Sequence, residues 1–269
     1  MRKRFGQALR IGVSPHGLAL VKTSRWQGAS MEVLAEHQFA GGAPGFEAIG
    51  AAVRQLLDQG GGANWPLTVV LADELARLWQ VSPPDGSTRL ADLEGAAALR
   101  FQTLYGEPAA NWQIAALWDA SAPFLAAAMP RHLLSLLEHA AGEQHATLVE
   151  VVPQFIAAWN RWRPVVRAGA WFGMHQQGVL TLGAAFDGKL QAVRSVAMPA
   201  GASLDWLGQH VAREALRLNL PAPGRLHLAG DAPDTWHHAA SGAFSCSLLR
   251  AGSLKLSPAA QLAATGART

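Results

Sequence analysis

The chain repeats one order of expected elements: three strands, a helix and a fourth strand. The order starts near residue 8 and again near residue 168, and the two copies share a pattern rather than residue identities. In each copy the three strands are short and separated by turn residues, which is typical of an antiparallel meander. A helix and a short apolar strand follow, and such a strand is typical of a buried, parallel position. The recurrence predicts an α/β protein with two similar lobes.

Turn and capping residues define the limits of both copies. Gly60-Gly61-Gly62 ends the first helix, and Ser203 is expected to cap the second. The first copy contains strands 9–13, 18–23 and 31–39, a helix over 45–59 and a strand at 67–71. The second contains strands 168–175, 178–186 and 189–197 with an Asp187-Gly188 turn, a helix over 204–218 and a strand at 226–229.

A stretch of different texture separates the two copies. Apolar spacing predicts helices over 89–105 and 131–141, and strands over 112–118, 124–129 and 146–152. The predicted domains are 1–88 as the first lobe, 89–145 as an inserted α+β subdomain, 146–167 as a return segment to the first lobe and connector, and 168–269 as the second lobe. The tail, 251–269, is expected to be a loose final segment.

Composition excludes several classes of protein. Hydrophobic residues make up 50% of the chain and charged residues 15%, which argues against disorder. The single cysteine, Cys246, cannot form an intrachain disulfide, and no stretch of about 18 apolar residues predicts a membrane span. The net charge is only +3 and its basic residues are scattered, so no nucleic-acid partner is expected. Histidines, cysteine and carboxylates do not fall at ligand spacing, so no metal site is predicted.

The first hairpin of each copy has glycine-containing turn chemistry but no acidic residue. These hairpins span residues 11–22 and 170–181. No Asp or Glu precedes Glu32, and none lies between Glu150 and Asp187. A clamp that hydrolyses nucleotides needs acidic groups to hold Mg²⁺ or to position water. The hairpins therefore predict a scaffold without these catalytic groups.

The duplicated pattern and its hairpins resemble the actin-like (ribonuclease H-like) ATPase fold. The likeness is to its bacterial secretion branch, the PilM-type pilus assembly proteins and the cytoplasmic domain of GspL-type secretion proteins. The segments that carry it are 11–22, 69–79, 171–182 with the following Asp187-Gly188 turn, and 226–231. The resemblance implies two actin-like lobes around a cleft, with 89–145 as the extra subdomain between the halves.

The resemblance also implies where a nucleotide would have been held. Active members carry acidic residues near the positions of Val13 and Ser14 and in the second hairpin, and Pro15 here lacks a backbone N–H. We therefore expect no catalytic residue and no cofactor, with ATP as the one ligand that the resemblance leaves open. The vestigial nucleotide cleft comprises Gly12, Ser14, Gly17, Gln176, Gln177 and Gly230.

The function that the resemblance implies is a non-catalytic cytoplasmic adaptor, held at the inner membrane through its partners. It would bind a short cytoplasmic segment of an inner-membrane pilus or secretion protein, or an assembly ATPase. Trp79, Trp112 and Trp118 are the expected docking residues, because tryptophan is enriched at binding surfaces; a place in the core is the competing interpretation for each.

Two rival functions stay open at this point. One is an ATPase or kinase relative that uses displaced acids, with Asp73 and Asp231 as candidates. The other is a sensor that binds a nucleotide or another small ligand without hydrolysing it.

Overall fold

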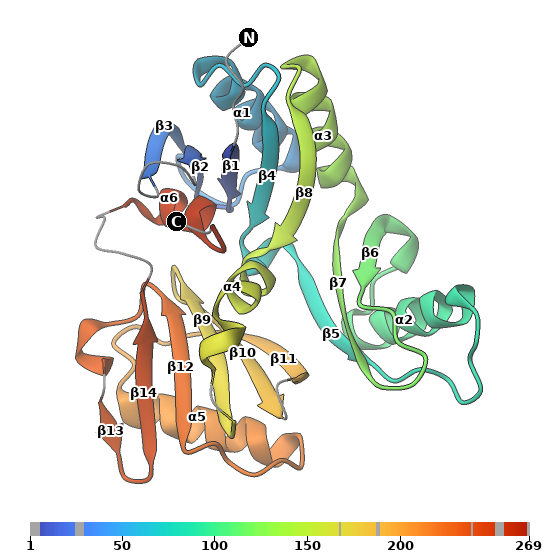
Figure 1. Cartoon of the computed structure of the whole chain (residues 1–269), viewed down its shortest axis with the longest axis vertical. Coiled ribbons are helices and arrows are strands. Elements are labelled where there is room, and N and C mark those ends of the chain that lie inside the picture. Colours follow the sequence, from blue (N-terminus) through green and yellow to red (C-terminus); the bar gives the residue numbers. More distant parts are fainter. Residues whose placement is uncertain are drawn as a thin grey trace. The chain divides into compact units, whose positions relative to one another are not determined.

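A computed structural model gives the fold, and it describes residues 6–24, 30–166, 168–186, 189–237, 239–250 and 256–267. The chain forms two compact units. The first comprises Met1–Ala76, Met129–Arg161 and Ala251–Thr269, and the second comprises Arg77–Ala128 and Trp162–Arg250. Figure 1 shows their elements coloured along the sequence.

The first unit is built on a five-stranded sheet with the order β3-β2-β1-β4-β8. The first three strands form an antiparallel meander, and β4 and β8 extend it in parallel. Its strands are β1 (Gln7–Val13), β2 (Gly17–Ser24), β3 (Ser30–Gln38), β4 (Pro66–Leu71) and β8 (Thr147–Pro153).

Helices cover both faces of this sheet. Alternate residues of β1, among them Leu9 and Ile11, pack with α1 (Phe46–Gln59) and α3 (Arg131–Glu143). The opposite face carries Ala19 and Val21, which pack with α6 (Pro258–Ala264), and the neighbouring α4 (Gln154–Trp162) shares a cluster with α6. Because successive side chains of a strand point to opposite faces, both sides of these strands are apolar and buried.

The second unit contains a six-stranded sheet with the order β11-β10-β9-β12-β14-β13. Helix α5 (Leu204–Arg217) packs on it through Leu207, Val211 and Ala215, and Ser203 caps that helix by accepting a hydrogen bond from the Trp206 N–H at 3.1 Å. The strands are β9 (Ala170–Gln176), β10 (Val179–Phe186), β11 (Lys189–Ala197), β12 (Arg225–Gly230), β13 (Ala240–Ser241) and β14 (Phe244–Leu249).

A smaller three-stranded sheet, β5-β7-β6, also belongs to the second unit. Helix α2 (Leu90–Tyr105) packs on it through Leu93, Ala97 and Phe101. Its strands are β5 (Arg77–Val81), β6 (Trp112–Ala116) and β7 (Phe124–Pro130).

The repeated order predicted from the sequence is confirmed. The series β1–β2–β3–α1–β4 and β9–β10–β11–α5–β12 have the same sheet order, and each gains a further parallel strand, β8 or β14. The predicted turn at Asp187-Gly188 lies outside the described residues.

The predicted boundaries differ from the structure in two places. The small sheet begins at β5, which the sequence did not predict as a strand, and α3, expected in the inserted subdomain, belongs to the first unit. The strand β8 lies in the first unit, as expected for the return segment. The tail is not simply loose: α6 packs on β1 and β2 of the first unit, because its alanines fit closely against Gly12.

Candidate functional site

In the turn between β1 and β2, the backbone N–H groups donate to acceptors of the turn itself. Ser14 is 1% exposed, and its hydroxyl oxygen accepts hydrogen bonds from the His16 N–H at 3.2 Å and the Gly17 N–H at 3.1 Å. The Ser14 N–H donates to the Gly17 carbonyl at 3.1 Å, and Pro15 has no N–H. A phosphate-binding loop presents such groups to its ligand. Here the serine hydroxyl and the turn carbonyl accept every hydrogen bond that residues 14–17 can donate from the backbone.

Close packing explains the glycines of the first hairpin. A Cβ atom at Gly12 would lie 2.5 Å from the Ala263 nitrogen and 2.6 Å from the Ala259 carbonyl oxygen, both in α6. A Cβ atom at Gly17 would lie 2.6 Å from the His37 carbonyl oxygen in β3. Both positions therefore need glycine for contacts inside the first unit, without any ligand.

The turn between β9 and β10 receives an acidic side chain from elsewhere in the chain. Gln177 and Gly178 have φ values of 47° and 81°, as in a type I′ hairpin turn. The Gln177 N–H donates to Oδ2 of Asp231 at 3.0 Å, and Nδ1 of His175 lies 2.5 Å from Oδ1 of the same residue. Asp231 follows β12 directly, so the parallel pairing of β12 with β9 brings it to this turn. The sequence offered Asp231 only as a displaced catalytic acid, and the structure shows it bound to the hairpin.

The same contacts determine the ionisation of Asp231. Burial, the largest influence, acts to raise its pKa, but the hydrogen bonds from His175 and from the Gln177 N–H outweigh it. The pKa of Asp231 is therefore lower than its ordinary value. Its carboxylate takes the place at this turn that an anionic ligand would need.

Gly230 permits this arrangement. Its φ is +102°, and a Cβ atom there would lie 1.8 Å from the His175 carbonyl oxygen, to which the Asp231 N–H donates at 3.1 Å. Only glycine fits such a close approach of two strands. Gln176, the remaining predicted residue, is 6% exposed at the end of β9.

Asp73, the other displaced acid suggested by the sequence, holds a helix. Its Oδ1 accepts a hydrogen bond from the Phe155 N–H at 2.9 Å, in the first turn of α4. A carboxylate there stabilises the helix end through its unpaired N–H groups and dipole.

The burial of Trp79 and Trp112 favours a place in the core, the competing interpretation, over the expected docking role for these two residues. Trp79 and Trp112 are 2% and 7% exposed, and they pack around Phe101 in the core of the small sheet. Trp118 is half-buried and contacts Phe124. Trp79 is buried because it lies in β5, on the face of the small sheet that α2 covers.

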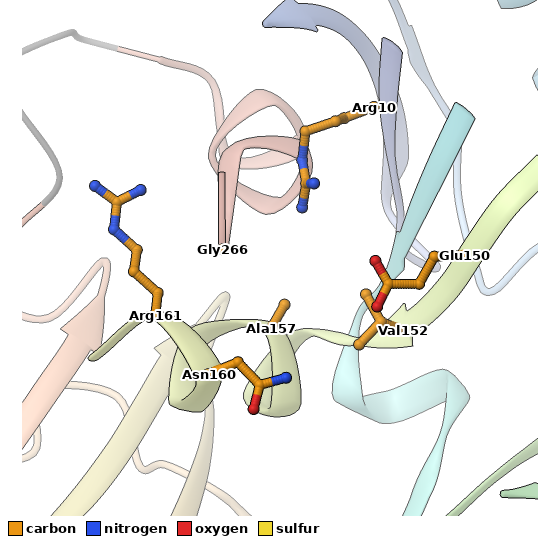
Figure 2. Close-up of a pocket in the computed structure, with 7 residues that line it drawn as sticks. All are labelled: Arg10, Glu150, Val152, Ala157, Asn160, Arg161 and Gly266. Carbon is orange, nitrogen blue, oxygen red and sulfur yellow. The ribbon is translucent and has the colours of Figure 1, made fainter. Parts of the chain in front are cut away.

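A cavity of about 170 Å³ lies within the first unit, and no residue of the β1–β2 turn lines it. Figure 2 shows its lining residues. Arg10 enters it from β1, but it donates to the carbonyl oxygens of Ala263 and Thr265 at 2.8 and 2.6 Å. Arg161 donates to the Ala267 carbonyl oxygen. Burial lowers the pKa of both guanidinium groups. The two arginines thus fix the end of α6, whose last carbonyl groups have no partner within the helix and attract positive charge. The lining residues are Arg10, Glu150, Val152, Ala157, Asn160, Arg161 and Gly266.

The described residues offer neither a metal-binding cluster nor a membrane-spanning helix. Histidine, cysteine and carboxylate side chains nowhere gather in a group of three or more that could hold a metal ion. None of the helices in these parts of the chain has the length and apolar character of a membrane span.

Comparison with known proteins gives structural similarity only. No protein-family model matches the chain, and the comparison with curated proteins gave no match. The structure is similar to the cytoplasmic domain of EpsL, an inner membrane component of the type II secretion system of Vibrio cholerae. The TM-score is 0.63 at 13% identity, over 98% of this chain and 96% of that one.

Two other solved structures are similar to this chain. A Bacteroides thetaiotaomicron protein with an actin-like ATPase fold and unknown function has a TM-score of 0.60 at 12% identity, over 87% of this chain and 85% of that one. A chain of the PilM–PilN type IV pilus biogenesis complex has a TM-score of 0.54 at 16% identity, over 80% of this chain and 66% of that one. The repeated sheet order and these similarities together show that the chain has the actin-like ATPase fold.

Proposed function

We propose that this protein is a non-catalytic adaptor in a type II secretion-like or type IV pilus assembly. In this proposal it binds a short cytoplasmic segment of an inner-membrane component, and an assembly ATPase is a second candidate partner. The non-catalytic part of the proposal rests on the hydrogen bonds of the two hairpin turns. Oxygen atoms of the chain itself accept the hydrogen bonds of residues 14–17 and of the Gln177 N–H.

Phosphoryl transfer depends on donors that cradle the phosphates and on acids that hold Mg²⁺. The carboxylates of Asp73 and Asp231 are the nearest candidates in sequence to the strand ends, and each binds a backbone N–H. Recruiting either one to a metal would break a hydrogen bond that stabilises its own unit. This cost supports a scaffold over an ATPase.

The assembly part of the proposal is supported by the nature of two structural neighbours. One is an inner membrane component of a secretion system, and the other belongs to a complex of pilus biogenesis. Both are proteins of multi-component assemblies, and the fold would serve this chain as a platform in the same way.

The edges of the main sheets are poorly suited to binding a peptide as an added strand. The pairing registers leave one extra residue in each of three edge strands, Leu34 in β3, Val149 in β8 and Gln191 in β11. Such bulges protect sheet edges from pairing. A partner is therefore expected to bind on side chains.

The small subdomain, residues 77–128, offers such side chains. It carries four large hydrophobic residues that are substantially exposed: Leu90, Leu99, Leu104 and Leu117. Leu99 is 67% exposed on α2, and nothing lies within 4 Å of where a Cβ atom of Gly95, one turn earlier, would be. An exposed apolar residue beside an open helix backbone suits the close approach of a partner helix.

Binding of cytoplasmic segments tests this proposal. Synthetic segments of candidate inner-membrane partners would be titrated against the intact chain and against L99D. We expect L99D to weaken binding about tenfold or more, as for a central apolar contact. L216D is the matched control, since Leu216 is 79% exposed on α5. Equal binding by the original chain and L99D would refute the docking surface, and saturable ATP hydrolysis that D231N abolishes would favour the rival enzyme.

A further inference from the structure

The outer face of α5 carries positive charge that the proposed adaptor function does not use. Arg213 and Arg217 are exposed there, and the only acidic residues of the helix are Asp205 and Glu214. The carboxylate of Asp205 accepts a hydrogen bond from the Ser241 hydroxyl. The exposed part of the helix towards its C-terminal end is therefore basic.

Glu214 fixes two arginines in this surface. Its side chain is 5% exposed, with Oε1 2.5 Å from Nη1 of Arg217 and Oε2 3.5 Å from Nε of Arg194 in β11. The side chains of Arg194 and Arg217 remain 59% and 66% exposed. A guanidinium group has five N–H donors, so both arginines keep donors for another anion. The net charge of this surface is +2, from the guanidinium groups of Arg194, Arg213 and Arg217 and the carboxylate of Glu214.

Apolar and aromatic groups accompany these charges. Leu216 is 79% exposed and lies one turn after Arg213 in the outer part of the helix. The rings of Trp206 and His210, both half-buried, stack at 5.1 Å with an interplanar angle of 7°. Arginine beside an exposed leucine, with a half-buried tryptophan on the same helix, is the composition of helix faces that contact the headgroup region of a bilayer.

We propose that the outer face of α5, formed by Trp206, Arg213, Leu216 and Arg217 with Arg194 beside it, binds the surface of an anionic membrane directly. Figure 1 shows α5 along the sheet of its unit, and its inner face packs on that sheet. The contact is therefore peripheral: the arginines meet lipid phosphates, and Leu216 reaches the boundary of the acyl chains. An acidic protein or a nucleic acid would also pair with the arginines. Against a phosphate backbone, however, Leu216 would bury no apolar surface.

This contact is separate from the partner-binding surface on α2. Each basic residue near an anionic bilayer contributes about 1 kcal/mol, or about fivefold in partitioning. The contact alone is weak, and it would add to the tether that a membrane-bound partner provides.

Vesicle co-sedimentation of the intact chain tests the inference. The probes are vesicles of phosphatidylcholine alone and of an equimolar mixture with phosphatidylglycerol. We expect binding to the mixed vesicles only, weakened by salt. R213E should reduce partitioning about 25-fold, because it changes the charge by two units, and L216S should reduce it severalfold.

Two control variants make the test specific. R100E makes the same change of charge at an exposed position of α2, and V149S removes an apolar side chain that is 63% exposed in β8; both variants should bind vesicles like the original chain. Equal losses in R213E and R100E, no binding to mixed vesicles, or undiminished binding by L216S would overturn the inference. Preferential binding to an acidic peptide or to DNA by the same arginines would also overturn it. Loss of partner binding in L99D leaves this result unaffected, so the two proposals fail separately.

Discussion

The two hairpin turns occupy corresponding places in the repeat, but different kinds of oxygen accept the hydrogen bonds of their backbone N–H groups. In the first unit the neutral hydroxyl of Ser14 accepts hydrogen bonds within its own turn. In the second unit a charged carboxylate, 54 residues further along the chain, binds the Gln177 N–H. The first solution depends on local sequence, whereas the second depends on the pairing of β12 with β9. A hairpin turn can therefore satisfy its backbone N–H groups in two ways, with a hydroxyl of the turn itself or with a carboxylate that the fold brings to it.

The largest expected difference between the two units concerns their glycines. G230A places a Cβ atom against the His175 carbonyl at a φ of +102°, whereas G12A meets the backbone of α6 at an ordinary φ. Overpacking costs about 1–3 kcal/mol, and a left-handed conformation adds about 1–2 kcal/mol. We expect losses of about 2–5 kcal/mol for G230A and about 1–3 kcal/mol for G12A in urea unfolding. A smaller loss for G230A than for G12A would contradict the close approach of β12 to β9.

The next effect concerns the carboxylate at the second turn. D231N keeps the size of the side chain but removes the charge that His175 and the Gln177 N–H stabilise. Charge-assisted hydrogen bonds contribute about 1.5–3 kcal/mol, so we expect a loss of about 1–3 kcal/mol at neutral pH. D234N removes a carboxylate from a far more exposed site and should cost less than about 1 kcal/mol. Thermal unfolding of the two variants measures the difference.

Acidification should remove the stabilisation that Asp231 gives the second turn but should leave the first turn unaffected. The pKa of Asp231 is lower in the folded chain than its ordinary value, because its hydrogen bonds outweigh the effect of burial. Its contribution to stability is therefore complete above the unfolded-state pKa and is lost as the pH falls through the folded-state pKa. The difference in unfolding free energy between the original chain and D231N should shrink on acidification below about pH 4. A constant difference down to the acid limit would contradict the assignment.

The smallest effect is expected at the first turn. S14A removes the acceptor for the His16 and Gly17 N–H groups in a buried turn, at a cost of about 1–2 kcal/mol. Because a hydroxyl does not titrate in this range, the cost should be the same at neutral and acidic pH. A pH-dependent effect of S14A would remove the contrast between the turns.

The sequence predicted the repeat and the main strands because alternation and turn residues are local signals. The reason for Gly12 could not be predicted, since its neighbours in α6 lie at the other end of the chain. The link between Asp231 and Gln177 likewise requires the parallel register of β9 and β12. The sequence left open whether Trp79 lies at a docking surface or in the core, and its burial could not be predicted because residues 77–81 were not recognised as a strand. The hydrogen bonds of the Ser14 turn depend on local sequence alone. A serine hydroxyl often accepts hydrogen bonds from the backbone N–H groups two or three residues later.

Nucleotide binding tests the central claim, that both turns are already satisfied by the chain itself. A fluorescent ATP analogue would be titrated to millimolar concentration against the purified chain, with and without Mg²⁺. We expect no saturable binding under either condition. Saturable binding that requires Mg²⁺, and that S14A or D231N alters, would show that one of these turns still holds a nucleotide.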